Sequence, residues 1–123
     1  MRNTAEVEKG TADLHVHTHH SDGQDSPTEV VQWATRLGLD VIAITDHDVI
    51  DGALIASALA RREESGPEVV VGEEVSSRDG HILGLYLTRL VRPGMSAEET
   101  IAAIHEQGGV AVAAHPYHFL FLA

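Results

Sequence analysis

The spacing of apolar residues changes repeatedly along this chain, and the changes predict a series of strands and helices. Nearly unbroken apolar runs at 41–45 and 110–114 are typical of strands buried on both faces of a parallel sheet. The valine-rich segment 69–75 predicts another strand, and residues 14–18 alternate as a half-buried strand does. Helically spaced apolar residues follow the capping signals at 26–29 and 96–99, each of which has serine first and glutamate last. These two helices are expected to end at glycines, Gly38 and Gly108.

Two further segments complete the predicted order. An alanine-rich helix is expected from Asp51 to Glu64, and Asp79-Gly80 predicts a hairpin turn into an extra strand at 82–87. The order is therefore βαβαββαβ. It indicates an α/β fold of parallel strands with right-handed crossovers and one added hairpin strand.

Composition limits what kind of protein this is. The chain has 123 residues, 43% of them hydrophobic and 22% charged, which is typical of a folded domain rather than a disordered chain. We expect a polar, disordered leader over residues 1–11 and one domain over 12–123, too short for a complete (β/α)8 barrel of about 250 residues. No apolar run is long enough for a membrane span, so we expect a cytoplasmic protein with no membrane partner.

Charge and cysteine content exclude several functions. The absence of cysteine excludes disulfides, thiolate zinc sites and a cysteine nucleophile. The formal charge of −11 argues against a passive nucleic-acid-binding module, because such a surface repels phosphates. There is no serine-hydrolase elbow and no phosphate-binding loop. A lysine-carbamate metallohydrolase is also disfavoured, since the single lysine, Lys9, precedes the histidine-rich segment.

Histidines and carboxylates gather where the predicted strands end. Because such ends share one side of a parallel α/β fold, these side chains are expected to converge. Each could instead be an ordinary loop or core residue, but many ionisable groups crowded together are costly without a metal or partner. The converging residues are His15, His17, His19, His20, Asp22, Asp46, His47, Asp48, Glu73, Glu74, His81 and His115.

The spacing of His15 and His17 gives this convergence a direct chemical meaning. Strand residues two apart share a face about 7 Å apart, so both imidazoles can reach one metal ion. Imidazole and carboxylate together suit Zn²⁺, Mn²⁺ or Fe²⁺ and do not choose among them. Alternation does not choose between Glu73 and Glu74, because valines flank both faces of their strand.

Five motifs in order resemble the polymerase and histidinol phosphatase (PHP) family. They are Asp-Leu-His-Val-His-Thr at 13–18 with Ser-Asp-Gly at 21–23, Ala-Ile-Thr-Asp-His-Asp at 43–48, Gly-Glu-Glu-Val-Ser at 72–76, His-Ile-Leu-Gly-Leu at 81–85 and Ala-His-Pro at 114–116. The resemblance implies the N-terminal portion of a distorted (β/α)7 barrel. It also implies a two- or three-metal centre that hydrolyses phosphoesters of a small phosphorylated substrate, a nucleotide or a nucleic-acid end.

The resemblance also implies residue roles. His15 and His17 would bind the first metal, Glu74 would bridge to a second completed by His81 and His115, and Asp22 with His47 would bind a third. The family pattern Gly-x-Glu selects Glu74 over Glu73. Glu74, His81 and Asp46 are the expected catalytic residues. Asp46 and Asp48 are expected to orient the metal ligands rather than to bind metal themselves.

The resemblance further implies a late Asp-x-His pair, which these 123 residues lack. We therefore expect a domain incomplete at its C-terminal end: a truncated chain, a natural fragment, a barrel completed by a partner or second copy, or a substitute ligand in His118. Two functions stay open. One is an active metal-dependent phosphoesterase, and the other is a catalytically incomplete, metal-binding half-barrel with a structural or regulatory role.

Overall fold

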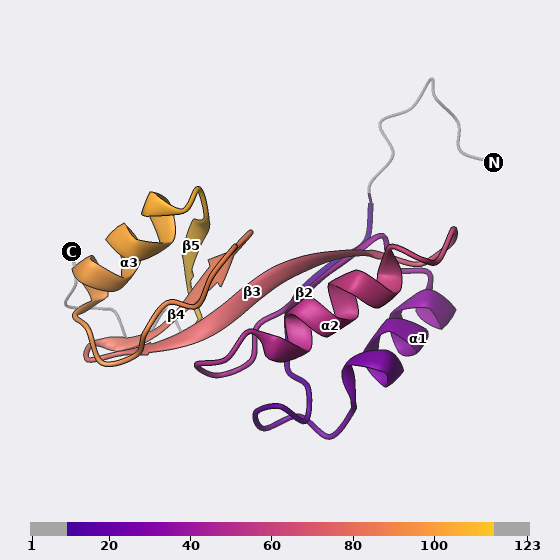
Figure 1. The fold of residues 1–123 in the computed structure, drawn as a ribbon, viewed down its shortest axis with the longest axis horizontal. Coiled ribbons are helices and arrows are strands. Elements are labelled where there is room, and N and C mark those ends of the chain that lie inside the picture. Colours follow the sequence, from indigo (N-terminus) through magenta and orange to yellow (C-terminus); the bar gives the residue numbers. More distant parts are fainter. Residues whose placement is uncertain (1–9, 115–123) are drawn as a thin grey trace.

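Five strands and three helices follow one another in the computed structural model, which describes residues 10–114. The predicted order βαβαββαβ is confirmed (Figure 1). The elements are β1 (Ala12–Val16), α1 (Pro27–Leu37), β2 (Val41–Ile44), α2 (Asp51–Ala60), β3 (Glu68–Ser77), β4 (Gly80–Leu85), α3 (Ala97–Glu106) and β5 (Val110–Ala113). No described helix is long and apolar enough to cross a membrane.

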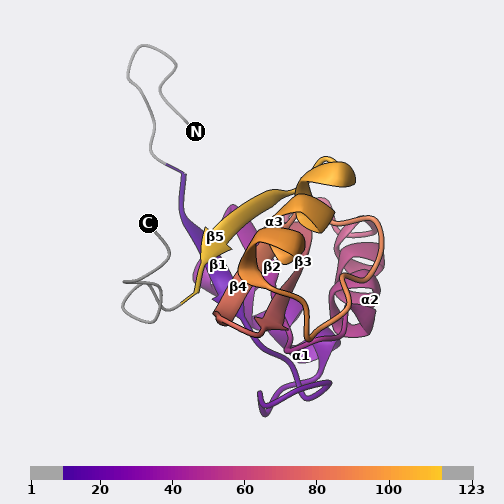
Figure 2. The ribbon, with the colours of Figure 1, turned by 90° about the vertical axis from the view of Figure 1, so that its left-hand side faces the viewer.

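The strands form one mixed sheet in the order β1-β2-β3-β4-β5. β1, β2 and β3 are parallel, whereas β4 runs antiparallel to both β3 and β5. The α/β class is therefore confirmed, with β4 as the expected hairpin strand. The sheet curls, with the helices along one side of it (Figure 2), which is consistent with part of a PHP-type barrel.

Local capping explains where two helices begin. The Ser26 hydroxyl accepts from the Glu29 N–H at 3.1 Å, and the Glu29 carboxylate accepts from the Ser26 N–H at 3.0 Å. Ser96 and Glu99 make the same pair of bonds at the start of α3. α1 ends at Gly38, whose φ of 70° is a conformation that glycine adopts without strain. The predicted capping signals are confirmed.

Several predicted boundaries were wrong, and three of them have a clear local cause. β1 ends at Val16 rather than Thr18, because the Thr18 N–H leaves the sheet and donates to Asp46. α2 ends at Ala60 rather than Glu64, where short-range turn bonds replace the helical pattern. β4 covers 80–85 rather than 82–87, because Tyr86 adopts a φ of 61° and turns the chain.

The two faces of the sheet have different surroundings. On the face covered by the helices, here called the helix face, Ile42 and Ile44 pack under α1 and α2, and Val75 and Ile82 pack in the cluster that includes α3. The opposite side is here called the open face. The pairing of the strands places three exposed apolar side chains on this face: Leu14, Val110 and Val112, which are 44–49% exposed. The helix face is thus a core, and the open face is covered only in part by the described residues.

Candidate metal centre

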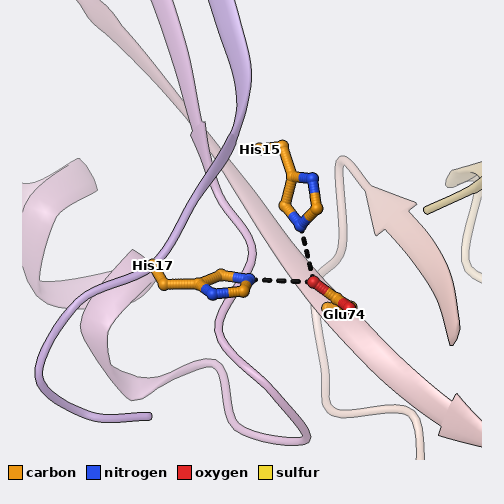
Figure 3. A group of neighbouring side chains, drawn as sticks. All are labelled: His15, His17 and Glu74. Carbon is orange, nitrogen blue, oxygen red and sulfur yellow. Dashed lines mark hydrogen bonds and ion pairs between the residues drawn. The ribbon is translucent and has the colours of Figure 1, made fainter. Parts of the chain in front are cut away.

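Glu74 is the centre of the histidine cluster. It lies on the open face of β3, its side chain is 1% exposed, and its Oε1 is 2.6 Å from His15 Nε2 and 2.9 Å from His17 Nε2. Figure 3 shows both imidazoles directed at this one carboxylate oxygen. The second oxygen, Oε2, is 2.8 Å from His81 Nδ1 and 3.7 Å from His47 Nδ1. Four imidazoles from three segments of the chain therefore meet one buried carboxylate.

Asp22 joins two of these histidines from the opposite side. Its Oδ1 is 2.6 Å from His17 Nδ1, and its Oδ2 is 3.2 Å from His47 Nε2. The Asp22 side chain is 63% exposed, in contrast to Glu74. The imidazoles of His17 and His47 are consequently held between a buried carboxylate and an exposed one.

Sheet topology brings these residues together. His15 lies in β1, His17 lies just beyond its end, and a parallel bridge places His47 opposite Glu74. His81 pairs with Ser76 near the start of β4, and that start meets the same edge because β4 runs antiparallel. β1 ends at Val16, between His15 and His17, and both imidazoles nevertheless reach the same carboxylate oxygen, as expected of two residues that can share one metal ion. The turn after Val16 still directs both rings at Glu74.

Histidine neighbours determine the charge state of the two acids. Burial alone would raise the pKa of Glu74, but hydrogen bonds from His15 and His17 and the nearby charge of His47 outweigh it and lower the pKa. For Asp22 desolvation is again the largest single effect and would raise the pKa, but the charges of His17 and His47 and the hydrogen bond to His17 together outweigh it and lower the pKa. Both acids are therefore held as carboxylates, the form that binds a cation.

The described residues form three groups with the donors of a metal site. In each group the ligand atoms lie within 4.8 Å of one another: His15 with His17 and Glu74, His17 with Asp22 and His47, and His47 with Glu74 and His81. Neutral imidazole and carboxylate are borderline-to-hard donors suited to Zn²⁺, Mn²⁺ or Fe²⁺. The donor set thus fits divalent metal, and the groups share members, so they describe one continuous centre.

Glu73, next to Glu74, faces the helix side instead. It is fully buried, its Oε1 accepts from the Val91 N–H at 2.9 Å, and its Oε2 has no hydrogen-bond partner among residues 10–114. Burial, with a smaller effect of the Asp48 charge, raises the pKa of Glu73 to about 7. It belongs to none of the three metal groups found in the described part of the chain.

Other predicted residues lie at or beyond the rim. His19 and His20 are exposed, with ring centroids 4.8 Å apart. His115 and His118 lie outside the described residues. Asp46 is fully buried beneath the loop after β1, where it accepts from Thr18 and Ser21. Thr18 was not among the predicted site residues, although it is a polar side chain within a histidine motif and is fully buried.

The chain is similar to several known proteins. A family model described as "PHP domain" matches residues 13–123. An uncharacterized protein of Methanocaldococcus jannaschii is 41% identical over an alignment 117 positions long, which covers 86% of this chain and 67% of that protein. A two-domain protein of Bacteroides vulgatus, containing a predicted PHP-like metal-dependent phosphoesterase, superposes with a TM-score of 0.67 at 25% identity. That superposition covers 81% of this chain and 33% of the other.

Relatives with named activities are longer. A 5'-3' exoribonuclease of Haemophilus influenzae is 42% identical over an alignment 89 positions long, which covers 69% of this chain and 31% of that enzyme. A phosphoribosyl 1,2-cyclic phosphate 1,2-diphosphodiesterase of Eggerthella lenta is 42% identical over an alignment 79 positions long, which covers 59% of this chain and 29% of that enzyme. The chain thus spans about a third of these two enzymes.

Proposed function

The chain belongs to the PHP family, whose model matches residues 13–123, and on that basis we propose that it acts as a metal-dependent phosphoesterase on a phosphomonoester or on a nucleotide or oligonucleotide phosphate ester. The observation that carries this proposal is Glu74, a fully buried carboxylate contacted by the imidazoles of His15, His17, His47 and His81. A buried carboxylate among four histidines supplies donors that suit the divalent ions of a multi-metal hydrolytic centre.

Each ligand has a role in this proposal. His15 and His17 would hold one ion together with Glu74, and Glu74 would bridge to a second ion held by His81 and His115. Asp22 and His47 would hold a third. Divalent ions in such a centre supply a water of lowered pKa and neutralise the charge that develops on phosphate. Ion number and identity, whether Mn²⁺, Zn²⁺ or Fe²⁺, belong to the proposal as well.

The chain's own residues prepare the centre for this chemistry. The buried Glu74 fixes the directions of His15, His17 and His81, so the imidazoles are oriented before a ligand arrives. Asp22 and the rings around it lie at the solvent side, where a phosphate can approach. The protein is acidic overall, with a formal charge of −11, so attraction for a phosphate has to arise locally at the centre.

Substrate class follows from the relatives with named activities. Their printed names describe a nuclease that acts from a 5' end and a cyclic phosphodiesterase acting on a phosphoribosyl compound. We therefore expect a phosphate ester of a nucleotide, an oligonucleotide end or a phosphorylated sugar. We also expect the protein to act in the cytoplasm, since it lacks cysteine and any long apolar run.

A metal-dependent assay of purified protein tests this function. The protein is incubated with Mn²⁺ and either p-nitrophenyl phosphate or a 5'-phosphorylated oligonucleotide, and phosphate release is measured. His17→Ala should abolish turnover, because it removes a ligand of the centre. His105→Ala is the matched control, since His105 is an exposed residue in the last turn of α3. Bound Mn²⁺ without turnover would instead favour a catalytically incomplete half-barrel with a structural or regulatory role.

The open face of the sheet has exposed apolar side chains that another segment or chain could cover. Leu14 on β1 and Val110 and Val112 on β5 are exposed apolar side chains on the two edge strands of the open face, and further polypeptide would bury them, either a longer parent chain or a second copy. The molar mass in solution distinguishes the two. A dimer that dissociates when Val112 becomes charged would identify the second copy, and a strict monomer would exclude it.

A further inference from the structure

Asp46 is a buried carboxylate that contacts a loop rather than the imidazoles. Its Oδ1 accepts from the Thr18 N–H at 2.6 Å and the Ser21 hydroxyl at 2.8 Å, and its Oδ2 accepts from the Thr18 hydroxyl at 2.7 Å. Asp46 and Thr18 are both fully buried. Three donors from one short segment therefore converge on one carboxylate at the end of β2.

The segment that Asp46 holds carries Asp22. The Thr18 carbonyl accepts from the N–H groups of Ser21 at 3.1 Å and Gly23 at 3.0 Å, which closes a tight turn around Asp22. A Cβ on Gly23 would lie 2.3 Å from the His17 carbonyl oxygen, so only glycine fits there. Because the Asp22 side chain is largely exposed, its position depends on this turn rather than on packing.

The first turn of α2 closes over the same bonds. A Cβ on Gly52 would lie 2.7 Å from both Asp46 Oδ2 and Thr18 Oγ1, so a larger residue would displace them. The helix thus approaches close enough to exclude water from the Asp46–Thr18 pair. Hydrogen bonds to a charged group are strong where solvent does not compete, and a rigid turn is the result.

Asp48, two residues further on, makes the equivalent contact on the other side of His47. Its Oδ1 accepts from the Ser76 N–H at 2.7 Å, and its own N–H donates to the Glu74 carbonyl at 3.2 Å. The Glu74 N–H in turn donates to the Asp46 carbonyl at 2.9 Å. Asp48 has a φ of 56°, a conformation that asparagine and aspartate tolerate better than alanine. This segment therefore attaches His47 to β3.

We propose that Asp46 and Asp48 are positioning residues that hold opposite sides of the metal centre independently. Asp46 fixes the turn that carries Asp22 against His17 and His47, and Asp48 fixes His47 against β3, which carries Glu74. This inference rests on the proposed function. It gives Asp46 an orienting role without contact to substrate, since its carboxylate is enclosed by Thr18, Ser21 and α2.

The other end of the same two strands offers a matched control. Asp40 Oδ2 accepts from the N–H of Thr11 at 2.9 Å and lies 3.4 Å from its hydroxyl, the same two donor types that Thr18 presents to Asp46. These bonds are exposed and lie at the opposite end of β1 and β2 from the histidines. Asp40→Ala thus removes the same chemistry at a distance from the centre.

The test is a titration of the full chain with Mn²⁺, in which binding is measured by calorimetry and by electron paramagnetic resonance of the bound ion. Asp22→Asn should remove the Mn²⁺ site that contains Asp22. Asp46→Ala should lower the Mn²⁺ affinity of that same site by about 10- to 100-fold, the usual effect of losing a partner that orients a ligand. Asp40→Ala should bind Mn²⁺ as the unmodified chain does. In the double variant, Asp46→Ala should add little to Asp22→Asn, because both act through one ligand.

Conservative variants separate the two positions. Asp48→Asn keeps an oxygen acceptor for Ser76 and tolerates the positive φ, so it should stay within about twofold of the unmodified Mn²⁺ affinity, whereas Asp48→Ala should not. Asp48→Gly relieves the strain without restoring the acceptor, so it should resemble Asp48→Ala. Asp46→Asn should not rescue binding, because its amide nitrogen replaces one of the two accepting oxygens.

Each result decides the inference. Mn²⁺ binding by Asp46→Ala equal to that of the unmodified chain overturns it and leaves the proposed function intact, as does full additivity with Asp22→Asn. If Asp46→Ala does not fold by circular dichroism, Ser21→Ala removes one donor in the loop and should weaken the Asp22 site about threefold. Unchanged binding by Ser21→Ala then overturns the inference. Failure of the unmodified chain to bind Mn²⁺ would overturn the proposed function itself.

Discussion

Glu73 and Glu74 are adjacent on β3 and almost equally buried, yet their surroundings give them opposite properties. Glu74 faces four imidazoles, and its pKa is lowered against the effect of burial. Glu73 faces the helix side, where a single backbone N–H of Val91 contacts it, and its pKa is raised to about 7. Burial alone therefore does not decide whether a carboxylate is charged. The partners on its own face of the sheet do.

The largest expected effect comes from the imidazole side of this comparison. Glu74→Gln removes the negative charge shared by the first and second proposed ions, so Mn²⁺ affinity should fall by about 100-fold or more, with loss of any phosphoesterase activity. Calorimetric titration measures the affinity. Glu98→Gln, an exposed position in α3, is the control and should leave binding unchanged. Retained affinity in Glu74→Gln would show that the histidines do not form the metal centre.

The sequence could predict the helices because their signals are local. The capping residues at Ser26 and Ser96 act within three positions of themselves, and the structure has both helices where these signals place them. The hairpin at Asp79-Gly80 is equally local, and it places His81 opposite Ser76. Such short-range chemistry requires no knowledge of the remaining chain.

Long-range bonds explain what the sequence could not predict. The end of β1 depends on Thr18 donating to Asp46, 28 residues away, and no periodicity encodes that bond. Alternation could not choose between Glu73 and Glu74, because Val70 and Val71 precede them on alternate faces and both faces are buried there. The family pattern Gly-x-Glu indicated Glu74, and the structure brings Glu74 to the histidines. The contacts of the Asp46 side chain with Thr18 and Ser21 could be seen only in the folded structure.

The stability of the hydrophobic helix face should fall when one of its side chains is shortened. Ile82 is 2% exposed and packs with Val75 and Ile104 on the helix face. Ile82→Ala should lower the free energy of unfolding by about 2–5 kcal/mol through lost burial and the cavity that remains. Urea denaturation followed by circular dichroism measures the change. A loss below 1 kcal/mol would mean that α3 is not firmly packed on β4.

Glu73 should make the free energy of unfolding depend on pH. An acid whose pKa is higher in the folded than in the unfolded protein makes no difference to stability at low pH, where both forms are protonated. Raising the pKa from its ordinary 4.5 to about 7 therefore costs stability progressively between these values, by at most about 3 kcal/mol above pH 7.

Glu73→Gln isolates that contribution. Its side-chain oxygen can still accept from the Val91 N–H, and it does not ionise. The difference in free energy of unfolding between the variant and the unmodified protein should grow from pH 4.5 to pH 7 and then level off. Urea titrations of metal-free protein at several pH values measure it, and subtracting the two curves cancels the histidines. A difference independent of pH would show that Glu73 is not held in a raised-pKa environment.

The smallest expected effect lies on the open face. Val112 pairs with Leu83 across β5 and β4 and is 44% exposed, so Val112→Thr removes little burial and should change the free energy of unfolding by less than about 0.5 kcal/mol. Denaturation at two protein concentrations measures this change and tests whether the face is covered. A larger cost that grows with concentration would mean that a second copy buries Val112. The two faces of the sheet would then both be cores, one within the chain and one between chains.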